Sequence, residues 1–129
     1  EGGKRPNSWH YKHMIQPTSM SAGSIMPTYE WLASNELNTS YTQAKLEAMQ
    51  SLGVPYSDEY VANAEMHLKA QAEEVAAKIV EEDPDITEVN PKEEMVALIA
   101  YLQRLGIDIN GEHSKHVEAT TAGTLTAQN

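Results

Sequence analysis

The sequence predicts an all-α fold. Apolar residues recur at spacings of three and four in two long segments, which is the pattern of an amphipathic helix. Glycine and proline residues divide these segments at positions where helices usually end. No segment shows the alternation of apolar and polar residues that is typical of a half-buried strand.

The first third of the chain predicts one short helix and an irregular loop. The helix covers residues 9–16, with Asn7 or Ser8 as its N-cap and Pro17 as its end. A loop with proline at both ends separates it from one further helical turn over residues 28–33.

The middle of the chain predicts two helices. The first covers residues 39–52 and ends at Gly53, a residue type that favours the position after a helix. Ser57 is the expected N-cap of a second, unbroken helix that reaches Glu82. The apolar face of this long helix consists of Val61, Ala64, Leu68, Ala72, Val75 and Ile79.

The last predicted helix has the clearest start. Asn90 is the expected N-cap, Pro91 takes the first helical position, Glu93 takes the third, and the helix ends at Gly106. One stripe of this last helix carries Met95, Leu98, Ile99, Leu102 and Leu105.

Residues 110–129 are rich in Thr, Ala and Gly without periodicity, so we expect a disordered tail.

Composition excludes several classes of function. A net charge of −10 with nine basic residues argues against a nucleic-acid partner, which needs clustered Lys and Arg. The absence of cysteine excludes disulfides, thiolate metal sites and covalent haem attachment within this sequence. No apolar run is long enough to span a bilayer. Phosphate-binding loops and hydrolase motifs are also absent from the sequence, so an enzymatic activity stays undecided.

Two histidines form an H-x-x-H pair in the first predicted helix. The spacing places His10 and His13 on one helical face, where they could bind zinc if a third ligand were present. The sequence around them contains no H-E-x-x-H motif. We therefore favour ordinary polar positions over a zinc enzyme.

The stretch "SIMPTYEWL" places a methionine directly before a proline and close to two aromatic residues. Pro27 restricts the backbone after Met26, which lowers the entropic cost of holding the thioether in one place. A thioether is a weak ligand for haem iron, and Tyr29 and Trp31 could enclose an apolar pocket around it. Simple packing of Met26 in the loop is the alternative.

Two separated motifs, "MPTY" and "EEMVALIAYLQRLG", together resemble the second half of a class I cytochrome c. The segment "GGKRPNSWHYKHMIQPTSMSAGSIMPTYEWL" and the run "LGVPYS" further resemble the mono-haem subunit II, or O subunit, of cbb3-type cytochrome c oxidases. The residues that fit this family are Trp9, His10, His13, Met14, Met26, Pro27, Tyr29, Trp31, Leu32 and Leu52–Ser57.

The resemblance implies a fold and a site. Residues 1–109 would be the C-terminal portion of a cytochrome c-like domain, with a long inserted helix and without the haem-attachment helix. Met26 would be an axial ligand of haem c iron in the full-length protein, with Tyr29 and Trp31 beside the haem. No cofactor is expected on the fragment itself, because its sequence lacks C-x-x-C-H.

The resemblance also implies partners and a location. The subunit would pass electrons from a donor cytochrome c to the haem–copper subunit that reduces oxygen. An N-terminal membrane helix outside this sequence would hold it at the periplasmic face of a bacterial inner membrane, while the fragment would be soluble.

Three departures from the family pattern bear on the prediction. The C-x-x-C-H motif is missing, "QPTS" replaces "NPxS", and the segment from Ser57 to Val89 is longer and more acidic than expected. Without a haem-attachment helix, the apolar stripe of the last helix needs other contacts. We expect the helices to pack on each other or the fragment to form homo-oligomers. A haem-free helical interaction or assembly domain is the alternative function.

Overall fold

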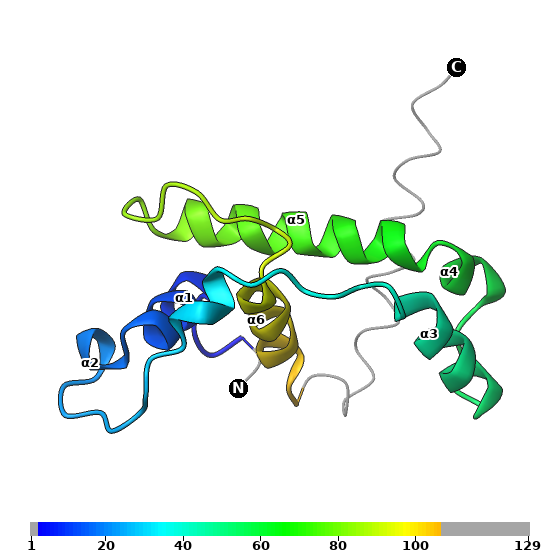
Figure 1. Cartoon of the computed structure of the whole chain (residues 1–129), viewed down its shortest axis with the longest axis horizontal. Helices are drawn as coiled ribbons and strands as arrows, with labels where there is room; N and C mark the ends of the chain where they lie inside the picture. Colours follow the sequence, from blue (N-terminus) through cyan, green and yellow to red (C-terminus); the bar gives the residue numbers. More distant parts are fainter. Residues whose placement is uncertain (1–2, 107–129) are drawn as a thin grey trace, which may run out of the picture.

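The computed structural model describes residues 3–106, which form seven helical segments. Figure 1 shows α5 lying along one side of the molecule, with α6 beneath its middle, α1 and α2 toward one end and α3 and α4 at the other. Within residues 3–106 no strand is present, and the all-α prediction is confirmed. The segments are α1 (Asn7–Ile15), α2 (Pro17–Met20), η1 (Glu30–Ala33), α3 (Thr42–Ser51), α4 (Asp58–Ala62), α5 (Ala64–Glu82) and α6 (Glu94–Arg104).

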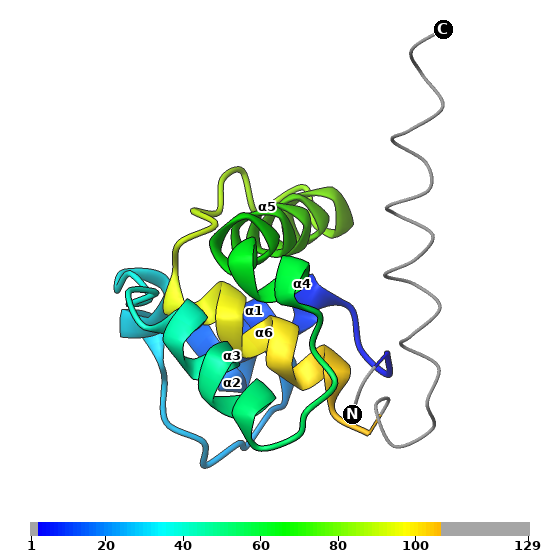
Figure 2. The same ribbon diagram turned by 90° about the vertical axis from the view of Figure 1, so that its right-hand side faces the viewer.

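The core lies where α1, α5 and α6 meet. The view along α5 in Figure 2 shows α6 and α1 beneath this helix. Ile79, Met95 and Ile99 are completely buried there. Side chains from α1 and η1 pack against this cluster, among them Met14 and Leu32. The chain's own helices therefore cover Met95 and Ile99 of the predicted apolar stripe completely, and Leu98, Leu102 and Leu105 only in part.

Helix α1 is stabilised by a residue from the far end of α5. The sequence predicted Asn7 or Ser8 as its N-cap, and this prediction is wrong. Pro6 takes the N-cap position and makes no side-chain hydrogen bond there. The backbone N–H of Ser8 instead donates to a carboxylate oxygen of Glu82 at 2.7 Å. A carboxylate at this end also interacts favourably with the positive end of the helix dipole.

The segment after α1 is more regular than predicted. Pro17 was expected only to end a helix, but it also begins α2 at the first helical position. Proline suits this position because its missing N–H would have no intrahelical partner there. The loop without regular structure therefore starts only after Met20.

The prediction of one unbroken helix from Ser57 to Glu82 is wrong. Ser57 caps α4 as predicted, accepting a hydrogen bond from the N–H of Tyr60. The chain then leaves helical geometry at Asn63, whose side-chain amide donates to the carbonyl of Glu59 at 3.0 Å. Side-chain bonds of this kind compete with the helical ladder. Helix α5 begins at the next residue.

The start of the last helix also differs from the prediction. Asn90 and Glu93 form a tight turn, in which the N–H of Asn90 donates to the Glu93 carboxylate at 3.1 Å. Glu93 is held extended by an antiparallel bridge with Glu36, and α6 begins at Glu94. The predicted N-cap Asn90 is therefore wrong: Glu93 takes this position without a side-chain hydrogen bond to the helix, and α6 begins three residues later than expected.

The predicted helix ends are confirmed. Gly53 and Gly106 follow α3 and α6 with φ of 93° and 84°, in the left-handed region that glycine adopts at low cost. Helix α3 starts later than predicted because Asn38 accepts the N–H of Ser40 in a local turn. The predicted tail over residues 110–129 lies outside the described residues.

In the part of the chain from residue 3 to residue 106, no helix combines the length and the apolar character that a membrane crossing requires.

Candidate functional site

The loop between α2 and η1 carries Met26. In Figure 1 this loop lies below α1 and α2, on the side away from α5. The Met26 side chain is half-buried, and its backbone N–H donates to the Ser24 hydroxyl at 3.2 Å. Ile25, its neighbour, is fully exposed. The thioether is therefore partly sheltered by the fold, while the residue before it faces outward.

Tyr29 and Trp31 lie together where the loop enters η1. Their ring centroids are 5.2 Å apart and the rings are tilted by 59°. The N–H of Tyr29 donates to the carbonyl of Met14 at 2.8 Å, which fastens the end of the loop to α1. Tyr29 is half-buried and Trp31 is half-exposed. The loop is thus attached to α1 at Tyr29, whereas the hydrogen bond between Met26 and Ser24 lies within the loop itself.

Both histidines of the H-x-x-H pair contact one tryptophan. The Trp9 ring stacks on His13 with centroids 4.5 Å apart, and its contact with His10 is edge-on at 5.3 Å. The Arg5 guanidinium lies 4.8 Å from the Trp9 ring centroid. His10 is buried. Within residues 3–106 no group of three or more His, Cys, Asp or Glu side chains is placed to hold a metal ion.

Sequence reasoning missed a buried acid at the junction of α1, α6 and the segment after η1. The side chain of Glu93 is 8% exposed and its two carboxylate oxygens accept from the Tyr11 hydroxyl at 3.5 Å and from the Asn90 N–H. Burial raises the pKa of Glu93 above its ordinary value of 4.5, although both hydrogen bonds oppose this. Burial and the Glu93 charge also raise the pKa of Tyr11.

A second link between α1 and the turn after α5 is ionic. Lys12 forms salt bridges with Asp83 and Asp85. The hydrogen bond from Lys12 lowers the pKa of Asp83, and the Asp85 N–H adds to this effect. The Asp83 contribution to stability is therefore lost as pH falls, which is opposite to the behaviour of Glu93.

We predict that Glu93→Gln stabilises the protein at neutral pH. Because the folded pKa of Glu93 is raised, its contribution favours folding below the unfolded pKa and is lost as pH rises through the folded value. Glutamine keeps the shape and can bond both Asn90 and Tyr11 without a charge. Urea unfolding of both proteins from pH 4 to 8 should show a difference that grows with pH. A difference in the free energy of unfolding that stays constant with pH would contradict the prediction. The pH dependence due to Asp83 is present in both proteins and cancels in this comparison.

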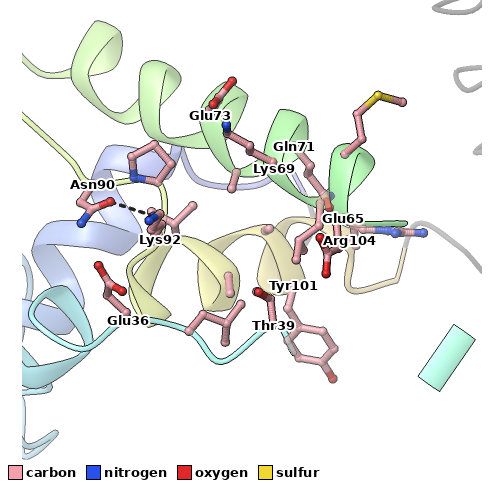
Figure 3. A pocket seen from close by; sticks show the side chains of 18 residues that line it. Glu36, Thr39, Glu65, Lys69, Gln71, Glu73, Asn90, Lys92, Tyr101 and Arg104 are labelled. Atoms are coloured by element: carbon pink, nitrogen blue, oxygen red, sulfur yellow. Dashed lines mark hydrogen bonds between the residues drawn. The ribbon is translucent and has the colours of Figure 1, made fainter. Parts of the chain in front are cut away.

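A groove of about 860 Å³ lies between α5, α6 and the segment over residues 36–39. Figure 3 shows Lys69 and Glu73 of α5 on one side and Tyr101 of α6 on the other, with Glu36 and Lys92 at one end. Its lining includes the small or apolar side chains Leu68, Ala72, Val96, Ala97 and Ala100. Small side chains on a helix allow another helix to approach its backbone closely. The α6 side of the groove is therefore lined mainly by small side chains.

Comparison with known proteins identifies a family that this chain matches. A family model described as "Cytochrome C oxidase, mono-heme subunit/FixO" matches residues 1–109. No curated protein matches the chain.

Proposed function

The chain belongs to the family of mono-haem subunits of cytochrome c oxidase, and from this premise we propose that it is the electron-transfer part of a cbb3-type oxidase subunit II. In the proposal Met26 is an axial ligand of haem c iron in the full-length protein. The observation that carries the proposal is the position of Met26 on a loop that the hydrogen bond from Tyr29 to Met14 attaches to α1, in a chain of this family.

The residues present fit one side of such a haem site. A half-buried thioether is a suitable axial donor, and Pro27 restricts the backbone that carries it. Tyr29 and Trp31 supply adjoining ring surface next to it in the chain. The sequence has no cysteine, so covalent attachment would come from a segment outside it, and we propose that the histidine of the same C-x-x-C-H motif is the second axial ligand.

The groove beside α6 supports the same proposal. The resemblance to class I cytochromes c implies that the last helix packs across the haem-attachment helix. Helix α6 lines an open groove with Ala97 and Ala100. We propose that the haem-attachment helix packs into this groove in the full-length protein.

The chain's own residues would set the conditions for electron transfer. Bound haem supplies a one-electron carrier, and the thioether of Met26 favours its reduced form. Ser24 and the Tyr29 backbone would keep the thioether in place through the change of charge. We further propose that the electron comes from a donor cytochrome c and goes to the haem–copper subunit at the periplasmic face of the membrane.

One observation favours a second function. The described helices bury Ile79, Met95 and Ile99 completely among their own side chains, which an assembly domain also requires. The two functions differ in what lies before residue 1 in the gene. Electron transfer requires an upstream C-x-x-C-H, preceded by an apolar span of about 20 residues.

The first test is the absorption spectrum of the full-length protein. We expect covalently bound, low-spin haem with the near-infrared band of thioether ligation to ferric iron. The matched control is the same protein with both upstream cysteines changed to serine, which should retain helical circular dichroism and lose the haem. A full-length protein without haem would leave the assembly function instead.

A further inference from the structure

An antiparallel bridge fastens the segment after η1 to the start of α6. The backbone N–H of Leu37 donates to the carbonyl of Lys92 at 2.8 Å, and the N–H of Glu94 donates to the carbonyl of Asn35 at 3.0 Å. We call residues 35–37 the strap. Residues of both bridged segments line one end of the groove beside α6 (Figure 3). The bridge therefore holds two parts of the groove's lining together.

The bridge places two glutamates opposite each other. Its hydrogen bonds flank the pair of Glu36 and Glu93, so this pair is of the narrow type, in which the two Cα atoms are about 4.5 Å apart. Glu36 is exposed, whereas Glu93 is only 8% exposed. On either side of Glu93, Lys92 is exposed and Glu94 adds a further acidic residue. Like charges at directly opposite positions are destabilising, so the strap offers an ionised Glu93 no compensation.

Two neutral groups donate to the Glu93 carboxylate. Helix α1 supplies the Tyr11 hydroxyl, and the turn before α6 supplies the N–H of Asn90. Lys12, which follows Tyr11, forms its salt bridges with two aspartates of the turn after α5. The loss of hydration outweighs the two hydrogen bonds, which is why the pKa of Glu93 is raised. The closed bridge therefore favours the protonated acid over the carboxylate.

We propose that the strap is a pH-sensitive device, which is held on α6 while Glu93 is protonated and opens more readily once Glu93 is ionised. Opening brings the charge into water and relieves the desolvation cost. The strap can open by itself at low cost, because its three residues are exposed and two backbone hydrogen bonds close the bridge. Opening would uncover the end of the groove that the strap lines. The device goes beyond the proposed function and needs no haem.

The test is amide hydrogen exchange of the full chain, followed by NMR from pH 4 to 8 and corrected for the intrinsic exchange rate. Protection of the Leu37 N–H should fall as pH rises above 4.5, the ordinary pKa of the acid, and level off above the folded pKa. The total fall should equal the ratio of the Glu93 acid constants in the open and closed states. A protection factor for Leu37 that does not change with pH would overturn the proposal.

The buried core supplies the reference for local opening. Low concentrations of urea should speed exchange of the Ile99 N–H, because its release requires the core to unfold. The Leu37 N–H should respond little to urea, since opening of the strap exposes little surface. If both amides exchange with the same opening free energy and the same response to urea, the strap opens only with the whole fold and the proposal is wrong.

Two matched variants identify the titrating group. Glu93→Gln should make the protection of the Leu37 N–H independent of pH. Glu36→Gln makes the same chemical change at the exposed member of the pair and should retain the fall in protection. Retention of the fall in Glu93→Gln, or its loss in Glu36→Gln, would show that Glu93 is not the sensor. The pH series on the unchanged chain tests the strap even if a variant fails to fold.

Discussion

Replacing Ile99 with alanine should destabilise the protein by about 2–5 kcal/mol. Ile99 is 0% exposed and belongs to the cluster in which α5 and α6 meet. Removing its side chain loses apolar burial and leaves a cavity that rigid helices fill incompletely. Because domains of this size are stable by only about 5–15 kcal/mol, this loss is a large part of the total. Urea unfolding followed by circular dichroism at 222 nm would measure it.

The control for this prediction is Tyr101→Ala in the same helix. Tyr101 is 61% exposed, so its truncation should cost about 1 kcal/mol or less. Both variants change helix propensity in the same favourable direction, which leaves burial as the difference between them. Equal destabilisation by the two substitutions would show that α6 is not packed against α5 in solution.

Replacing Met26 with alanine should remove an iron ligand from the haem-bearing full-length protein. We expect the near-infrared thioether band to disappear and the reduction potential to fall by on the order of 100 mV, within the roughly 0.8 V range that axial ligands set. The thioether stabilises reduced iron, so its loss favours the oxidised state. Redox titration followed by visible absorption would measure the change.

Met20→Ala is the matched control for Met26→Ala. Met20 is also half-buried and lies on the same side of the molecule, at the end of α2. It should leave the band and the potential unchanged. Met26→His adds a second check, because it should retain a low-spin spectrum with a lower potential. If Met26→Ala keeps the thioether band, another residue is the ligand and the proposed role of Met26 is wrong.

The local features of the fold could be predicted from the sequence. Ser57, Gly53 and Gly106 act at helix ends as predicted, because capping depends on hydrogen bonds and backbone angles within a few residues. The apolar spacing that predicted α6 is also confirmed by the burial of Met95 and Ile99. The break at Asn63 was missed, since asparagine occurs both inside helices and at their ends.

The candidate site could be predicted only in part. The residues Met26, Tyr29 and Trp31 are close in sequence, so their common segment was evident before the structure. The anchoring of Tyr29 by Met14 and the exposure of Ile25 depend on how the loop lies against α1. The sequence had no signal for the burial of Glu93, because its partner Tyr11 is 82 positions away.

The sequence by itself determined the helical class, the C-terminal ends of α3, α5 and α6 and the presence of a thioether on a proline-restricted loop. Tertiary structure alone decided that Glu82 caps α1, that Glu93 is buried beside Tyr11 and that α6 leaves a groove next to α5. The reason is physical. Helix ends and turns are set by bonds between near neighbours, whereas burial and long-range hydrogen bonds depend on which helices pack together.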